Sequence, residues 1–205
     1  MWRLRGLAAS VILVAGLAAC APVPAPSPTP TQTGVRPTPK PTPTVTLPPL
    51  AIPSCDLLVP AATAQRVFSP SVELFGETPA SEFVAGIPVP SLPVVLSTAS
   101  PARACLWTVP GSDGAFSLVV AGVTPAERET LQDELRSEGF AETDTGDVTT
   151  FELERDDGSA SGLGATHVFS GDAWILADST ALSSSRPVAD AALEALRATN
   201  PALQL

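Results

Sequence analysis

The chain has 205 residues and a formal net charge of −10 at neutral pH, with 23 prolines, three cysteines, one histidine and no tyrosine. Every aspartate and glutamate lies at residue 56 or later, so residues 51–205 carry seven arginines against 21 acids and a net charge of −14. A surface of that sign repels nucleic acids and anionic lipid headgroups, which excludes binding to either through charge. These 155 residues suffice for one domain with its own core.

Residues 1–19 are typical of a signal peptide. Arg3 and Arg5 precede a stretch at 6–19 without charged residues. As a helix this stretch would span roughly 20 Å, short of a bilayer core of about 30 Å. The sequence Leu17-Ala18-Ala19-Cys20 resembles the bacterial lipobox, which predicts a diacylglycerol anchor on Cys20 and therefore attachment to a membrane.

Residues 20–50 are predicted to form a tether between the anchor and the domain. Eleven prolines and seven threonines lie in residues 21–50. Such a segment favours extended polyproline II and spans up to roughly 90 Å. Two interpretations remain open, a plain spacer and an O-glycosylated stalk.

The domain, residues 51–205, begins with a predicted short helix over 60–68, started by a proline. Residues 69–100 contain five prolines around the runs FVAGI and VVL, a pattern that allows edge strands or ordered loop but no long helix. Residues 102–109 alternate, with Cys105, Trp107 and Val109 on one face. A turn at 111–114 leads to 115–123, which is apolar on both faces and predicts a central strand.

A helix to about residue 138 is predicted from the capping box at Thr124 and Glu127, with Leu131, Leu135 and Phe140 along one side. Residues 148–154 form the next predicted strand, with Phe151 and Leu153 inward and Glu152 and Glu154 outward. In a hairpin of 165–169 and 173–178, His167 would lie opposite Leu176, and Phe169 opposite Trp174.

The last element is a predicted helix from Pro187 to about 198, with Val188, Ala192 and Leu196 on one side. The predicted fold class is α+β. We expect an antiparallel sheet of four or five strands with helices packed on one face.

Once Cys20 is assigned to lipid, Cys55 and Cys105 remain as an even pair in an oxidising compartment, and they are expected to form a disulfide. A structural zinc site would need more ligands than two cysteines and one histidine supply. A reactive free thiol is the remaining, weaker alternative.

The combination of a lipobox, a Pro/Thr tether, Cys55-Asp56-Leu57-Leu58 at the start of the domain, and Cys105-Leu106-Trp107 about fifty residues later resembles a group of uncharacterised actinobacterial cell-surface lipoproteins. The resemblance implies a place at the cell envelope and a disulfide. It implies no catalytic residue.

Catalytic motifs are incomplete in this sequence. His167 is the only histidine, and its expected neighbours are apolar, which favours a core position over a base in a Ser-His-Asp triad. In residues 158–162 the position that a nucleophile elbow reserves for serine is Ala160. Gly162 and Gly164 lack the third glycine of a dinucleotide-binding loop and lead into a strand.

Acidic residues offer a weaker possibility. Asp156 and Asp157, with Glu152 and Glu154, could gather a Ca²⁺ ion loosely, but the spacing of an EF-hand is missing. A solvated acidic turn is the favoured interpretation of these residues, and also of Asp144 and Asp147. We therefore assign no catalytic, metal or cofactor-binding residue.

The sequence favours a membrane-anchored extracytoplasmic lipoprotein that is not an enzyme. Its domain would bind a small molecule or an envelope protein, as a sensor or accessory. The alternative is an extracytoplasmic hydrolase that uses carboxylates, with or without a weak calcium site.

Overall fold

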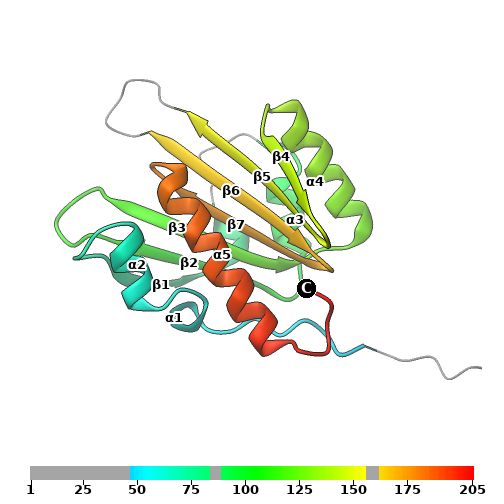
Figure 1. The fold of residues 1–205 in the computed structure, drawn as a ribbon, viewed down its shortest axis with the longest axis horizontal. Helices are drawn as coiled ribbons and strands as arrows, with labels where there is room; N and C mark the ends of the chain where they lie inside the picture. The colour runs from blue at the N-terminus through cyan, green and yellow to red at the C-terminus, as the bar shows by residue number, and fades with distance from the viewer. Residues whose placement is uncertain (1–46, 84–88, 156–161) are drawn as a thin grey trace, which may run out of the picture. The chain divides into compact units, whose positions relative to one another are not determined.

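The computed structural model describes residues 47–83, 89–155 and 162–205. The chain divides into two compact units, Met1–Pro43 and Thr44–Leu205, and every described residue belongs to the second. This unit has the predicted α+β class, and its described residues contain a seven-stranded antiparallel sheet, five α-helices and one short 3-10 helix (Figure 1).

The sheet has the strand order β1-β2-β3-β7-β6-β5-β4, with every neighbouring pair antiparallel. Its strands are β1 (Glu73–Thr78), β2 (Ala102–Thr108), β3 (Ala115–Gly122), β4 (Ala141–Thr145), β5 (Val148–Arg155), β6 (Leu163–Ser170) and β7 (Ala173–Ser179).

The central strands are apolar on both faces. In β3, Leu118 and Val120 face one side while Val119 faces the other, and in β7 Ile175 and Leu176 divide in the same way. All five side chains are at most 1% exposed. A strand of this kind is stable only when both of its faces are covered.

Helices accordingly cover both faces. One face packs against α1 (Cys55–Leu58), α2 (Ala61–Val67) and α5 (Leu182–Thr199), and Figure 1 shows α5 running across it. The opposite face packs against η1 (Ala80–Glu82), α3 (Leu92–Thr98) and α4 (Pro125–Ser137). The prediction that helices pack on one face is therefore wrong, because the apolar second face of the central strands needs its own cover.

Both strand pairs predicted around a short turn form hairpins, and the β6–β7 hairpin has the expected register. Cys105 and Trp107 of β2 share the α5 face, and Val109 packs beside them. In β6 and β7, His167 lies opposite Leu176, and Phe169 lies opposite Trp174. Gly171, with φ of +51°, occupies the turn between these strands, where glycine is the residue that adopts this conformation without strain.

The capping box at the start of α4 is also confirmed. Glu127 donates its backbone N–H to the Thr124 hydroxyl at 3.3 Å, and the Glu127 carboxylate accepts the Thr124 N–H at 2.8 Å. Leu131, Leu135 and Phe140 all pack under the sheet on the α4 side. Local capping and a regular apolar stripe were sufficient to predict this helix.

The sheet has seven strands where the sequence predicts four or five. The strands that the sequence does not predict are the two edges, β1 and β4. All five residues of β4 are exposed, as are four of the six residues of β1. An edge strand that buries little surface has no need for alternating apolar and polar residues. Only its backbone hydrogen bonds to the neighbouring strand favour it, and these leave no pattern in the sequence.

Helix α5 begins at Leu182, five residues before the predicted start at Pro187. Tertiary contacts hold this additional turn. Ser184 donates its hydroxyl to the carbonyl of Val67 at 2.9 Å, and the hydroxyls of Ser185 and Thr166 are 3.0 Å apart. Because these partners lie elsewhere in the chain, the local sequence signals for a helix start do not include them.

Two further predictions need correction. The VVL run lies in α3, a seven-residue helix, and not in an edge strand. Glu152 does not face solvent, since its side chain is 15% exposed and accepts a bond from Arg186 of α5 at 3.1 Å. Of the FVAGI run, only Phe83 belongs to the described residues.

The expected disulfide joins Cys55 to Cys105, with Cα atoms 5.8 Å apart. It connects α1 to β2 beneath α5, and both cysteines are buried. Since α1 has only four residues, it depends on this bond and on tertiary packing for its position.

Removal of the disulfide should destabilise the domain. With a sequence separation of 50, the chain-entropy model gives a loss of about 4 kcal/mol in the free energy of unfolding for Cys55→Ser with Cys105→Ser. Chemical denaturation would measure this, with Cys20→Ala in both proteins to remove the third thiol. Reduction of the parent should reproduce the loss, and an unchanged stability would contradict the structural role.

Candidate functional site

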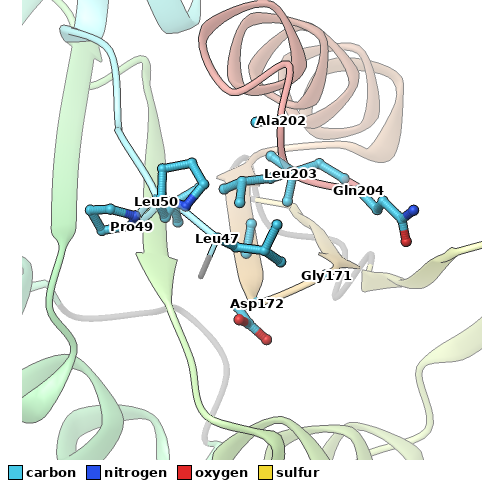
Figure 2. A pocket seen from close by; sticks show the side chains of 11 residues that line it. Leu47, Pro49, Leu50, Gly171, Asp172, Ala202, Leu203 and Gln204 are labelled. Atoms are coloured by element: carbon cyan, nitrogen blue, oxygen red, sulfur yellow. The ribbon is translucent and has the colours of Figure 1, made fainter. Parts of the chain in front are cut away.

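A pocket of about 560 Å³ lies where the predicted tether meets the domain. Three segments line it, namely residues 47–50, the β6–β7 turn at 171–173, and the C-terminal residues 202–205. Figure 2 shows Leu47 between the C-terminal segment and the Gly171–Asp172 turn. Distant parts of the sequence thus form one concave surface.

The lining is largely apolar. Leucine, proline and alanine supply eight of the eleven lining residues, and Asp172 is the only one with a charged side chain. Leu47 is 60% exposed, although its apolar side chain is large. A concave apolar surface with one well-placed polar group is the usual composition of a small-molecule site.

Asn200 binds Ala51, the residue that directly follows the predicted tether. Its side-chain oxygen accepts the backbone N–H of Ala51 at 2.8 Å, and its amide donates to the carbonyls of Ala51 and Leu196, also at 2.8 Å. Asn200 is only 6% exposed, so these bonds are shielded from water. The wall formed by residues 47–50 is therefore fixed next to the last turn of α5.

The β6–β7 turn is also held by α4, which packs on the face of the sheet opposite α5. Arg128 of α4 donates to the carbonyl of Gly171, and its guanidinium lies 5.8 Å from the centre of the Phe169 ring. Burial lowers the pKa of Arg128, while the nearby Asp172 carboxylate opposes that shift. A Cβ at residue 171 would lie 2.9 Å from the carbonyl oxygen of Gln204, so glycine permits the C-terminal segment to approach this closely.

A buried hydroxyl without a partner lies next to the pocket. Ser170 is 1% exposed, and its Oγ has no hydrogen-bond partner among the described residues. Ser170 lies directly opposite Ala173, a lining residue, on the same face of the sheet. An unsatisfied buried hydroxyl is uncommon in native structures, and a bound molecule is one means of satisfying it.

His167 lies in the core beneath α4, as its sequence neighbours predicted. It is 1% exposed, and its Nδ1 accepts the indole N–H of Trp174 at 3.3 Å. The Phe140 ring meets it edge-on at 5.2 Å. Burial lowers the pKa of His167 from 6.5 to about 3, so the imidazole is neutral at physiological pH.

The acidic residues considered for metal or hydrolytic chemistry lie in different environments. Glu152 pairs with Arg186, and Glu154 accepts the backbone N–H of Leu182 at 3.2 Å. Asp144 and Asp147 are exposed near the β4–β5 turn. Asp156, Asp157 and the Gly158–Gly162 motif around Ala160 lie outside the described residues, apart from Gly162.

Among residues 47–83, 89–155 and 162–205, no three metal-ligating side chains are grouped to hold an ion. No helix within those same ranges is both long and apolar enough to cross a membrane. Cys20 and the predicted signal peptide lie outside the described residues.

Comparisons with protein-family models, with curated proteins and with solved structures found no match to this chain. The resemblance to actinobacterial lipoproteins thus remains a prediction from the lipobox, the tether and the cysteine pair.

No motif in the sequence predicts the pocket. Its residues come from a segment assigned to the tether, from a hairpin turn and from the C-terminus, and none carries a recognisable motif. One local signal existed, since Leu47 and Leu50 bring leucine into an otherwise Pro/Thr-rich segment. Large apolar residues at the end of a polar tether indicate that the chain has begun to pack.

Titration of His167 should make the domain less stable in mild acid. Because the folded pKa of about 3 lies below the unfolded value of 6.5, its contribution is complete above pH 6.5 and is lost progressively as the pH falls towards 3. Between pH 6.5 and about pH 5 the free energy of unfolding should fall by about 2 kcal/mol. His167→Gln keeps an acceptor for Trp174 and should remove this loss in chemical denaturation, and an equal loss in both proteins would contradict the assignment.

Proposed function

We propose that this chain is a lipid-anchored protein of the cell envelope whose domain binds a small, mainly apolar molecule at the junction of tether and domain. The pocket of about 560 Å³ between residues 47–50, 171–173 and 202–205 carries this proposal. Its size lies within the range of ligand sites, which is about 300 to 1,000 Å³.

The chemistry of the lining indicates the class of ligand. Apolar side chains form most of the wall, so burial of an apolar ligand would provide the main driving force. Asp172 at the turn supplies a carboxylate for one polar or cationic end of the ligand. An amphipathic molecule with a compact apolar body fits these features.

The position of the pocket at the end of the predicted tether supports a link between ligand binding and the anchored segment. A chain anchored at Cys20 would enter the domain through residues 47–50, which form one wall. Ligand binding would therefore stabilise the docked end of the tether. We infer that the protein acts as a binding or sensing accessory of the envelope, and not through chemistry on the ligand.

A neutral environment-sensitive dye, N-phenyl-1-naphthylamine, would test for the site. We expect its fluorescence to rise with saturation on addition of the chain. Ala202→Trp should weaken dye binding about tenfold or more, since this lining residue is exposed and a large side chain there would fill the pocket. Asn200→Ala should weaken it as well by releasing the tether wall.

The matched control is Ala62→Trp, which adds the same side chain at an exposed position of α2, away from the pocket. This variant should bind the dye like the parent. Equal affinity of the dye for the Ala202→Trp and Ala62→Trp proteins would refute the proposed site.

The lipid anchor is tested separately by Cys20→Ala. Without the lipobox cysteine, no acyl chain can be attached, and the protein should move from the membrane fraction to the culture medium. Cell fractionation followed by immunodetection measures this. Continued retention in the membrane would overturn the assignment to a lipoprotein, while leaving the pocket proposal open to its own test.

A further inference from the structure

Three large apolar side chains are exposed together at α1 and β1. Leu57 is 62% exposed, Leu74 is 40% exposed and Phe75 is 72% exposed. The helix and the strand that carry them are in direct contact. Isolated exposed leucines are ordinary on protein surfaces, but three large apolar side chains exposed on two contacting elements, one of them a phenylalanine, are typical of an interaction surface. We call Leu57, Leu74 and Phe75 the α1–β1 patch.

The backbone beside this patch is available for pairing. Strand β1 is the end of the sheet, and no other described strand pairs with its outer side. Phe75 is the extra residue where the β1–β2 register shifts between Leu74 and Gly76. A bulge of this kind redirects a side chain at an edge, and here the redirected residue is a large aromatic one.

The opposite edge of the sheet gives an internal comparison. Strand β4 has the sequence AETDT, with two acids and no large apolar residue, although all of it is exposed. This is the usual way in which natural proteins keep an edge from pairing with other chains. Strand β1 also carries two acids, Glu73 and Glu77, but it presents the large apolar residues Leu74 and Phe75 as well, so the two edges differ in the apolar surface that they offer to a partner.

The disulfide makes the α1–β1 patch a fixed surface. Cys55 begins α1 and Cys105 lies opposite Glu77 of β1, on strand β2. The bond therefore holds the exposed Leu57 near the edge of the sheet. A surface that is already ordered loses little entropy when a partner docks.

The charges around the patch select the kind of partner. Asp56 follows Cys55 in α1, and Glu73 begins β1, and both are exposed. Glu77 on the same strand is paired with Arg103, while Arg66 on α2 is the other cation on the neighbouring elements. If a second copy of this chain docked here, its own Asp56 and Glu73 would lie near these acids. Two domains that each carry a net charge of −14 would therefore repel each other.

We propose that the α1–β1 patch is the docking surface for an extended, basic segment of a partner protein, which adds a strand to the outer edge of β1. Main-chain bonds along β1 supply affinity, Phe75 with Leu57 and Leu74 receives an apolar side chain, and Glu73 and Asp56 favour lysine or arginine. This surface is separate from the pocket at residues 47–50 and does not depend on the ligand proposed there.

Site-specific photocrosslinking in intact cells tests the proposal with the full chain. A photoreactive residue replaces Phe75 in one strain and Val94 in another. Val94 is a matched control, since it is 65% exposed and apolar but lies on α3, on the other face of the sheet. We expect a crosslinked partner only from position 75, and mass spectrometry should map the bond to an extended segment with a net positive charge.

Charge reversal provides the second measurement. In the strain with the crosslinker at position 75, Glu73→Lys should lower the yield of the crosslinked product about fivefold or more, because it places like charges against the basic segment. Glu194→Lys, at an exposed position of α5, makes the same change of charge elsewhere and should leave the yield unaltered.

Three results would overturn the proposal. They are a product from position 75 that is a dimer of this chain, a mapped segment that is neutral or acidic, and the same products from positions 75 and 94. A yield that falls equally with Glu73→Lys and Glu194→Lys would also overturn it, since the effect would then follow net charge and not the patch.

Discussion

Strands β3 and β7 lie in the middle of the sheet and are apolar on both faces, and this constraint determines how the remaining elements are arranged. Val119 and Leu176 require cover on one side, while Leu118 and Ile175 require it on the other. Helix α5 with α1 and α2 satisfies one face, and α3 with α4 satisfies the other. The sheet is therefore the middle of three layers, and the short helices matter as much as the long ones because each closes part of a face.

The same constraint explains where the surface is free to bind. Helices cover the centre of the sheet, so the features that remain accessible lie at its periphery, at the edge strands and at the ends of hairpins. The pocket forms where the β6–β7 turn, the C-terminal segment and the end of the tether meet beyond the last turn of α5. The α1–β1 patch forms where the sheet ends and a helix held by the disulfide lies beside it. The two surfaces use different residues and would take ligands of different chemistry.

Buried polar groups mark the positions at which distant segments are joined. Asn200 binds the backbone of Ala51 across 149 positions of sequence, and Ser184 binds that of Val67 across 117. Each such bond replaces one that the group would have made with water, so its net contribution is about 1 kcal/mol. Their importance is geometric, because the buried Asn200 amide would be costly to leave unpaired, and its bonds to the backbone of Ala51 hold that residue beside α5. His167 is similar, since it fills the core as a neutral ring and accepts one bond from Trp174.

The sequence by itself determined the local elements, namely the capped helix α4, the two hairpins, the register of the β6–β7 pair, the apolar faces of β3 and the partnership of Cys55 with Cys105. Each has a signal within a few residues or, for the cysteines, in the even pair of cysteines that residues 51–205 contain. Only the tertiary structure decided that both faces are covered, that β1 and β4 complete the sheet, that α5 begins at Leu182 and that residues 47–50 wall a pocket. These features depend on contacts between segments far apart in the chain, whose energies are absent from any local pattern of residues.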